Sequence, residues 1–339
     1  MHSAGTPVAG VNPVCYAQFN KQAPSPTMFS WLAGILAGLG APFQTGMNLR
    51  LRLKFGSPFV ASWISFAVSL LFLLAVLLLS GETLAYPWAR LSGEPAWIWL
   101  GGFCGVVFLT GNVLLLPRLG GVQTVIFPVF GQILMGLIID HFGLFHAPVS
   151  PLSLYRILGA ALLVAGVVFT ALARQGEGAQ PAVASGELSL WLWRAFAVAS
   201  GTLGAVQVAV NGYLGQIVHS ALKSTVVSFV TGILLLTLIC SFLILSGKVP
   251  LRRPQHEGFG PWWAWLGGVL GAIYVYVNVT LSHVIGTGGT VMVLLIGATL
   301  GGVLVDHFGL FGTARRPVNL KKSAGIALML LGAAATKLF

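Results

Sequence analysis

The sequence is 339 residues long, and 56% of these residues are hydrophobic while only 7% are charged. Since about a quarter of the residues in an ordinary soluble domain are charged, this composition excludes that class and indicates an integral membrane protein. The formal net charge of +11 does not indicate nucleic-acid binding, because the basic residues lie between apolar runs and form no aromatic-interleaved patch.

Residues 1–29 are rich in Pro, Ala, Gly and Ser and lack the apolar core of a signal peptide. We predict that they form a disordered tail. Two translation starts, Met1 and Met28, stay open, because the first apolar run begins directly after Met28.

Ten apolar runs follow, each close to the 20 residues that a bilayer-spanning helix needs. An all-α integral membrane fold with ten transmembrane helices is therefore predicted. The runs of the first half, 30–173, are 30–49, 57–80, 96–117, 121–140 and 153–173. Those of the second half, 190–339, are 190–214, 221–246, 262–283, 287–306 and 321–338. A polar linker, 174–189, separates the halves.

The two halves are related in sequence at an offset of 163, which becomes 166 after a short slip. The matched polar residues are Gln44 and Gln207, Asn48 and Asn211, and Asn112 and Asn278. The segment "DHFGLF" is identical at 140–145 and 306–311. Because each half has an odd number of spans, the second must enter the membrane in the opposite orientation, which predicts two five-helix inverted-topology repeats.

Orientation follows from Lys and Arg residues, which collect in the short cytoplasmic loops. Five of the eighteen basic residues fall on the side of both termini: Lys21, Arg90, Arg156, Lys223 and Lys337. The other thirteen fall on the opposite side. This asymmetry predicts that both termini lie on the outer side of the membrane.

The duplicated segments "GQILMGLIIDHFGLF" and "GATLGGVLVDHFGLF" resemble the drug/metabolite transporter superfamily. Within it they are most similar to the YdcZ-like family of bacterial inner-membrane exporters, in its fused ten-span form. The resemblance covers about residues 30–338 and implies a permease that works by alternating access. In small multidrug-resistance relatives a carboxylate of the first span couples drug and proton. Here that span, "WLAGILAGLGAPFQTGMNL", has no charge, so this mechanism does not carry over.

Polar side chains within apolar spans are the candidate substrate-binding residues, since burying them in a membrane is costly. Gln44 and Asn48 are four residues apart and share a helix face, as do Gln207 and Asn211. We expect the two faces to meet in one neutral cavity, with Asn112 and Asn278 adding to it. The alternative is that all six form structural hydrogen bonds between helices.

The two "DHFGLF" blocks end the fourth and ninth predicted spans. A carboxylate at a helix C-terminus opposes the helix dipole, so a nearby cation is expected to compensate it. The two predicted groups are Asp140, His141 and Arg156, and Asp306, His307 and Lys322. Each anchors a helix end, with Gly143 and Gly309 as C-terminal breakers; alternatively, the two ion pairs act as gates that form and break in turn.

Two glycine-rich sets, "GLGAP" at 38–42 and "GTGGT" at 286–290, allow either close helix packing or breaks in a helix. We favour packing for both. A phosphate-binding loop at 286–290 is excluded, because no strand precedes it.

Together these features predict a secondary-active transporter of the inner membrane, an exporter of a small polar or amphipathic metabolite. No enzyme, metal site or cofactor is predicted, since no catalytic or metal-ligand spacing occurs. Two alternatives stay open: a flippase of a lipid-linked substrate, and a non-transporting structural or sensory membrane protein. The substrate, the direction, the coupling ion and the oligomeric state, a homodimer included, are not given by the sequence.

Overall fold

The structure, a computed structural model, describes residues 28–172, 187–247, 261–312, 315 and 318–338. Most of the predicted tail and linker lies outside the described residues. Within them all regular structure is helical, as predicted. The helices are α2 (Met28–Phe55), α3 (Pro58–Leu79), α4 (Trp88–Leu91), α5 (Gly101–Phe142), α6 (Leu154–Leu172), α7 (Glu187–Ile217), α8 (Ala221–Leu245), α9 (Gly267–Phe308) and α10 (Leu320–Leu338). Short 3-10 turns are η1 (Ala96–Trp99), η2 (Leu144–His146), η3 (Trp262–Leu266) and η4 (Leu310–Gly312).

Six of the described helical stretches are long and apolar enough to cross a membrane. They are Pro58–Leu79, Gln123–Phe142, Leu154–Leu172, Leu188–Ile217, Ala221–Leu245 and Trp262–Phe308. The predicted spans at 30–49 and 321–338 do form helices, α2 and α10. α2 is less apolar than these six because it contains glycines and polar residues, and α10 is less apolar because it contains lysines.

The largest difference from the predicted elements is that the third and fourth spans of each half join into one helix. Both α5 and α9 contain 42 residues, and a straight helix of that length would be about 63 Å long. In α9 the regular geometry is interrupted at Gly286, whose φ of +75° and ψ of 173° suit only glycine. At "GTGGT" the helix therefore breaks at Gly286, while Gly288 keeps the expected packing role, because a Cβ added there would lie 3.3 Å from the Gly136 backbone of α5.

Contacts along α2 show that α9 turns back at this break. Near the N-terminus of α2, Gly34 lies against both Leu281 and Val293, which flank the break. Near the C-terminus of α2, Gly46 lies against Phe311, just beyond the end of α9. The first turn of α9 packs on the same part of α2. Both ends of α9 therefore lie at one end of α2, and its middle lies at the other.

The ends of α5 also meet, through the second aromatic residue of the first "DHFGLF" block. The ring of Phe145 lies 5.3 Å from that of Trp97, which precedes α5. At the matching positions of the second half, Phe311 lies 5.4 Å from Trp263. Each block thus brings together the two ends of its long helix. The preceding glycines, Gly143 and Gly309, have left-handed φ and end the helices as predicted.

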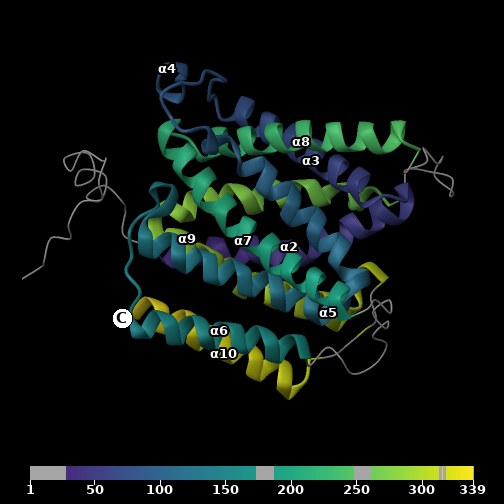
Figure 1. The fold of residues 1–339 in the computed structure, drawn as a ribbon, viewed down its shortest axis with the longest axis vertical. Helices are drawn as coiled ribbons and strands as arrows, with labels where there is room; N and C mark the ends of the chain where they lie inside the picture. Colours follow the sequence, from purple (N-terminus) through teal and green to yellow (C-terminus); the bar gives the residue numbers. More distant parts are fainter. Residues whose placement is uncertain (1–27, 173–186, 248–260, 313–314, 316–317, 339) are drawn as a thin grey trace, which may run out of the picture.

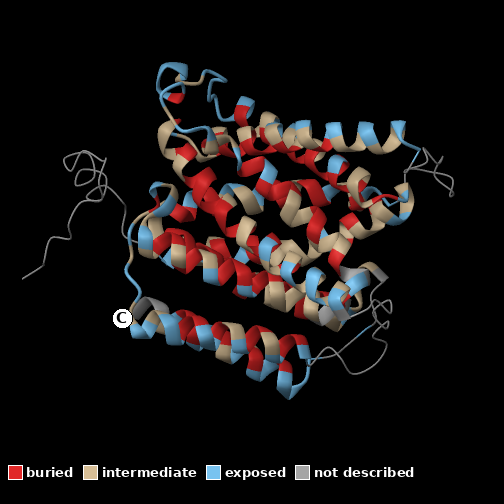
Figure 2. Cartoon of the chain, in the orientation of Figure 1, coloured by how far each residue is buried: buried red, intermediate tan, exposed pale blue. Residues whose placement is uncertain are grey.

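The helices form three layers (Figure 1). α2, α5, α7 and α9 fill the middle, α3 and α8 lie together on one side, and α6 and α10 lie together on the other. Buried residues concentrate in the middle layer (Figure 2). There α5 packs most extensively on α7, and α2 on α9, so the first helix of each half lies against the long helix of the other half.

Glycine allows this close packing, because a missing side chain lets two helix backbones touch. A Cβ atom added at Gly38 would lie 2.2 Å from the backbone oxygen of Leu294 in α9. At "GLGAP", therefore, the predicted packing role is confirmed.

The substitution Gly38→Ala should lower the stability of the protein, and Gly40→Ala should leave it nearly unchanged. A Cβ at Gly40 would meet only the Leu270 side chain at 3.6 Å, an ordinary contact. Overpacking against backbone costs about 1–3 kcal/mol. Melting temperatures of the two variants in detergent test this, and equal melting temperatures would contradict the described α2–α9 contact.

Candidate functional site

A small cavity lies among α5, α7 and α9 in the middle layer. Its volume is about 20 Å³, which is enough for about one water molecule. The polar and aromatic residues around it are Phe108, Gln132, Gln207, Asn211, Tyr274 and Asn278, and the rest are a glycine and three valines. None of these ten described residues carries a charge, so the cavity is polar but neutral.

Two asparagine side chains around the cavity each keep an unused acceptor. Asn278 donates its Nδ2 hydrogen to the backbone oxygen of Tyr274 at 3.1 Å, and Asn211 donates to Ser228 Oγ at 3.0 Å. Within the described part of the chain, the Oδ1 atoms of both asparagines accept no hydrogen bond, although both residues are at most 5% exposed. An unpaired buried acceptor costs about 1–3 kcal/mol. Because Asn211 Oδ1 lies against Gly101 of α5, where an added Cβ would be 1.8 Å from it, Asn278 Oδ1 is the acceptor left for a ligand or water that donates hydrogen bonds.

Of the six predicted cavity residues, the structure brings together the three of the second half, Gln207, Asn211 and Asn278. Their matches Gln44, Asn48 and Asn112 are not among the residues around this cavity. Gln44 and Asn48 lie against the first glycines of α9, as Gln207 and Asn211 lie against the first glycines of α5. The two polar faces do not meet, because α2 packs on α9 while α7 packs on α5. A substrate-binding role for any of the six stays a prediction.

Three cavity residues were missed by the sequence interpretation. Phe108 and Tyr274 match at the offset of 166, and both line this one cavity. The match could have predicted this contact, because equivalent residues of two related halves lie close together when they are near the axis that relates the halves. Gln132 is a buried polar residue without a polar match, and its place in an apolar run was the signal for it.

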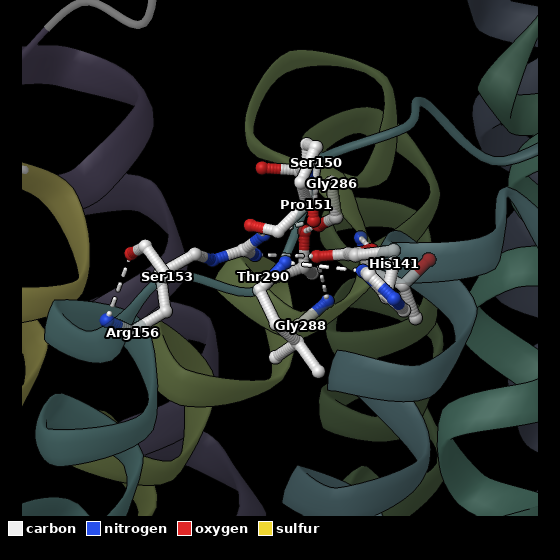
Figure 3. A network of polar contacts seen from close by, with 11 residues as sticks. His141, Ser150, Pro151, Ser153, Arg156, Gly286, Gly288 and Thr290 are labelled. Atoms are coloured by element: carbon white, nitrogen blue, oxygen red, sulfur yellow. Dashed lines mark hydrogen bonds and ion pairs between the residues drawn. The ribbon is translucent and has the colours of Figure 1, made fainter.

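The first "DHFGLF" block takes part in a network of polar contacts (Figure 3). Asp140 is at the centre of this network, and its side chain is fully buried. Its Oδ2 atom lies 3.0 Å from Arg156 Nη2 in an ion pair between α5 and α6. The same carboxylate accepts hydrogen bonds from two backbone amides of α9, Thr287 N at 2.8 Å and Gly288 N at 3.0 Å. Arg156 also donates to the backbone oxygen of Ser150. Asp140 thus joins three helices from both halves.

The position of these amides explains the buried carboxylate. Thr287 and Gly288 begin the second part of α9, directly after the break at Gly286. The first amides of a helix have no partner within the helix and carry a partial positive charge. In a membrane protein such groups must be satisfied by protein atoms. Asp140 supplies both oxygens, and Arg156 balances its charge.

The second block differs in geometry. Lys322 Nζ lies 4.0 Å from Asp306 Oδ2, and the Asp306 side chain is 14% exposed. Both predicted cations, Arg156 and Lys322, therefore lie beside their carboxylates. The histidines do not serve as the expected cations. The Nδ1 atoms of His141 and His307 each accept a hydrogen bond from the backbone N–H of the residue eleven positions later in the chain. They fasten the segment that follows the helix. Whether the two groups are anchors or gates stays a prediction.

Among the described residues, no three His, Cys, Asp or Glu side chains gather closely enough to hold an ion.

Known proteins resemble this chain in sequence and in fold. The model of the family described as "Putative inner membrane exporter, YdcZ" matches residues 29–169 and 192–335, which together make up most of the chain. Among solved structures, one titled only "Crystal structure of protein" has a TM-score of 0.62 at 17% identity, over 91% of this chain and 98% of that one. At such identity the likeness concerns the fold alone. No curated protein matches the sequence.

The substitution Asp140→Asn should destabilise the protein strongly, because it removes the charge that balances Arg156 and one of the two oxygens that accept the α9 amides. Losing one member of a buried pair costs about 3–5 kcal/mol. The matched variant Asp306→Asn should cost less, since its pair is longer and partly exposed. Thermal unfolding of both variants in the same detergent tests this. Equal losses would show that the two blocks are energetically equivalent, contrary to the structure.

Proposed function

Because the chain belongs to the YdcZ family of inner-membrane exporters, as its repeated segments predicted, we propose that it is a secondary-active transporter working by alternating access. The family makes it a multi-pass protein of the inner membrane. The single observation that carries the mechanism is the neutral cavity between helices of both halves, together with the unused acceptor of Asn278. Its small volume fits a closed state, in which a solute enters only after the helices move apart.

The proposed topology has ten spans in two inverted five-helix repeats. A helix of about 63 Å is twice the thickness of the hydrocarbon core, which is about 30 Å, so α5 and α9 each have the length for two crossings. The contacts that bring the ends of each helix together support this count. Both termini would then lie outside, which labelling of Cys15 by an impermeant thiol reagent from the periplasm tests.

Differences between matched positions support a two-state mechanism. In the second half Asn211 donates to Ser228, whereas in the first half the buried Asn48 amide has no partner within the described residues. The Asp140 ion pair is short and the matching Asp306 pair is longer. Two inverted halves in different conformations are what alternating access requires. In the opposite state, the first half would adopt the contacts now seen in the second.

The cavity also indicates the chemical class of the solute. Burying a full charge beside neutral groups is expensive, and no charge faces this cavity among the described residues. The unused Oδ1 atom of Asn278 is available as a hydrogen-bond acceptor. We therefore expect a small uncharged solute with hydroxyl or amide N–H donors.

Transport into proteoliposomes should show this preference. A panel of neutral polyols and amides, ammonium compounds and carboxylates is offered to the purified protein, and uptake of the neutral group is expected. The variants Asn211→Ala and Asn278→Ala should lower the rate about tenfold or more, since a lost hydrogen bond of about 1.4 kcal/mol corresponds to a factor of ten.

Thr45→Ala serves as the control, because Thr45 is exposed and its hydroxyl bonds only to its own helix. Unchanged rates in both asparagine variants would remove the cavity from the transport path. Uptake restricted to charged solutes would contradict the proposed solute class.

A further inference from the structure

A second pocket lies where α7 turns into α8, against α9. Its volume of about 300 Å³ is within the range of small-molecule sites. The polar residues around it are Gln216, His219, Ser220, Thr280 and His283. We refer to it as the outer pocket, because it lies at the end of α7 that the proposed topology places outside.

The outer pocket and the central cavity lie along one seam between α7 and α9. On α7, Asn211 lines the cavity and Gly215 lines the outer pocket, one helical turn apart on the same face. Between the two, the helices touch. A Cβ at Gly212 would lie 2.5 Å from Ser282 Oγ, and one at Gly215 would lie 2.9 Å from Val279 Cγ1. The seam is therefore closed where it separates the two spaces.

A hydrogen bond spans the seam at this closure. Gln216 Nε2 and His283 Nδ1 are 2.8 Å apart, and both side chains are partly buried. Both residues also line the outer pocket, and a Cβ at Gly215 would lie 3.4 Å from His283 Nε2, so the pair borders the closed part of the seam. His283 lies three residues before the break at Gly286, where α9 turns toward the Asp140 network. A movement at this break would therefore change the Gln216–His283 distance.

The first half does not repeat these groups. At the positions that match Gln216, His219 and His283 it carries Leu53, Gly56 and Pro117. In contrast, the glutamines and asparagines of the candidate cavity positions are repeated. A polar pocket that is absent from the matching positions is a specialised feature of one face, rather than a by-product of the duplicated fold.

The chemistry of the outer pocket resembles that of the cavity. His219 Nε2 accepts a hydrogen bond from Arg90 Nη1 at 2.8 Å, which leaves Nδ1 as the donor of the ring. Ser220 Oγ donates to Glu82 at 2.7 Å, so Glu82 and Arg90 each have a hydrogen-bond partner at the rim. The interior offers hydroxyl, amide and imidazole groups.

We propose that the outer pocket is the recognition site at the mouth of the transport path for a small uncharged polar solute, and that the Gln216–His283 hydrogen bond is the gate to the central cavity. The roles of the pocket and the gate rest on the proposed transport function, but the opening of the gate can be tested without measuring transport. Opening the gate joins the two spaces into one polar path along α7 and α9.

Cysteine accessibility tests the gate directly. In a background without the three native cysteines, Val275→Cys reports on the central cavity and Thr280→Cys on the outer pocket. An impermeant methanethiosulfonate reagent is added from the outer side. Thr280→Cys should react quickly in every variant. Val275→Cys should react slowly alone, and about tenfold faster when combined with either His283→Ala or Gln216→Ala.

His146→Ala is the matched control, because this histidine lies on the same face but packs against Tyr213 and Trp97 outside the pocket. The two gate variants lie on different helices, so a local folding defect in one of them would not explain the same result in both. If neither variant accelerates labelling of Val275→Cys beyond this control, or if Thr280→Cys is unreactive, the proposal is wrong. Faster labelling without solute uptake in proteoliposomes would instead uphold the gate and count against the transport function.

Discussion

The first amides of a helix that restarts in the protein interior have no water to bind, and in this protein the Asp140 carboxylate satisfies two of them. The break at Gly286 lets α9 turn back, and it leaves the amides of Thr287 and Gly288 without a partner within the helix. A carboxylate from the other half binds both, and Arg156 neutralises it. A helix break in one half is thus stabilised only when the two halves are assembled.

This constraint gives the repeated "DHFGLF" block several separate tasks. The aspartate lies beside a cation from the next helix, the histidine fastens the following loop, the glycine ends the helix, and the second phenylalanine joins the two ends of the long helix. The same residues perform most of these tasks in the second half, with the longer Asp306–Lys322 pair. In the proposed mechanism, this difference corresponds to one closed and one loosened face.

The sequence was sufficient for the helical class, the family and the pairing of each aspartate with its cation, because these follow from composition, the offset of the repeat and local spacing. It could not show that Asp140 binds the amides of α9, since that contact joins residues 147 and 148 positions apart. Periodicity also could not show that α2 packs on α9, which keeps Gln44 and Asn48 away from the cavity. Gly286 illustrates the limit best, because a packing glycine and a breaking glycine are identical in sequence.

The central claim is that Asp140 holds the restarted helix of the opposite half. Site-resolved hydrogen–deuterium exchange of the Thr287 and Gly288 amides in lipid nanodiscs tests this most directly, comparing the unmodified protein with Asp140→Ala and with Asp306→Ala. The account predicts that both amides are protected, that Asp140→Ala accelerates their exchange at least tenfold, and that Asp306→Ala does not. Equal exchange in all three proteins would contradict it.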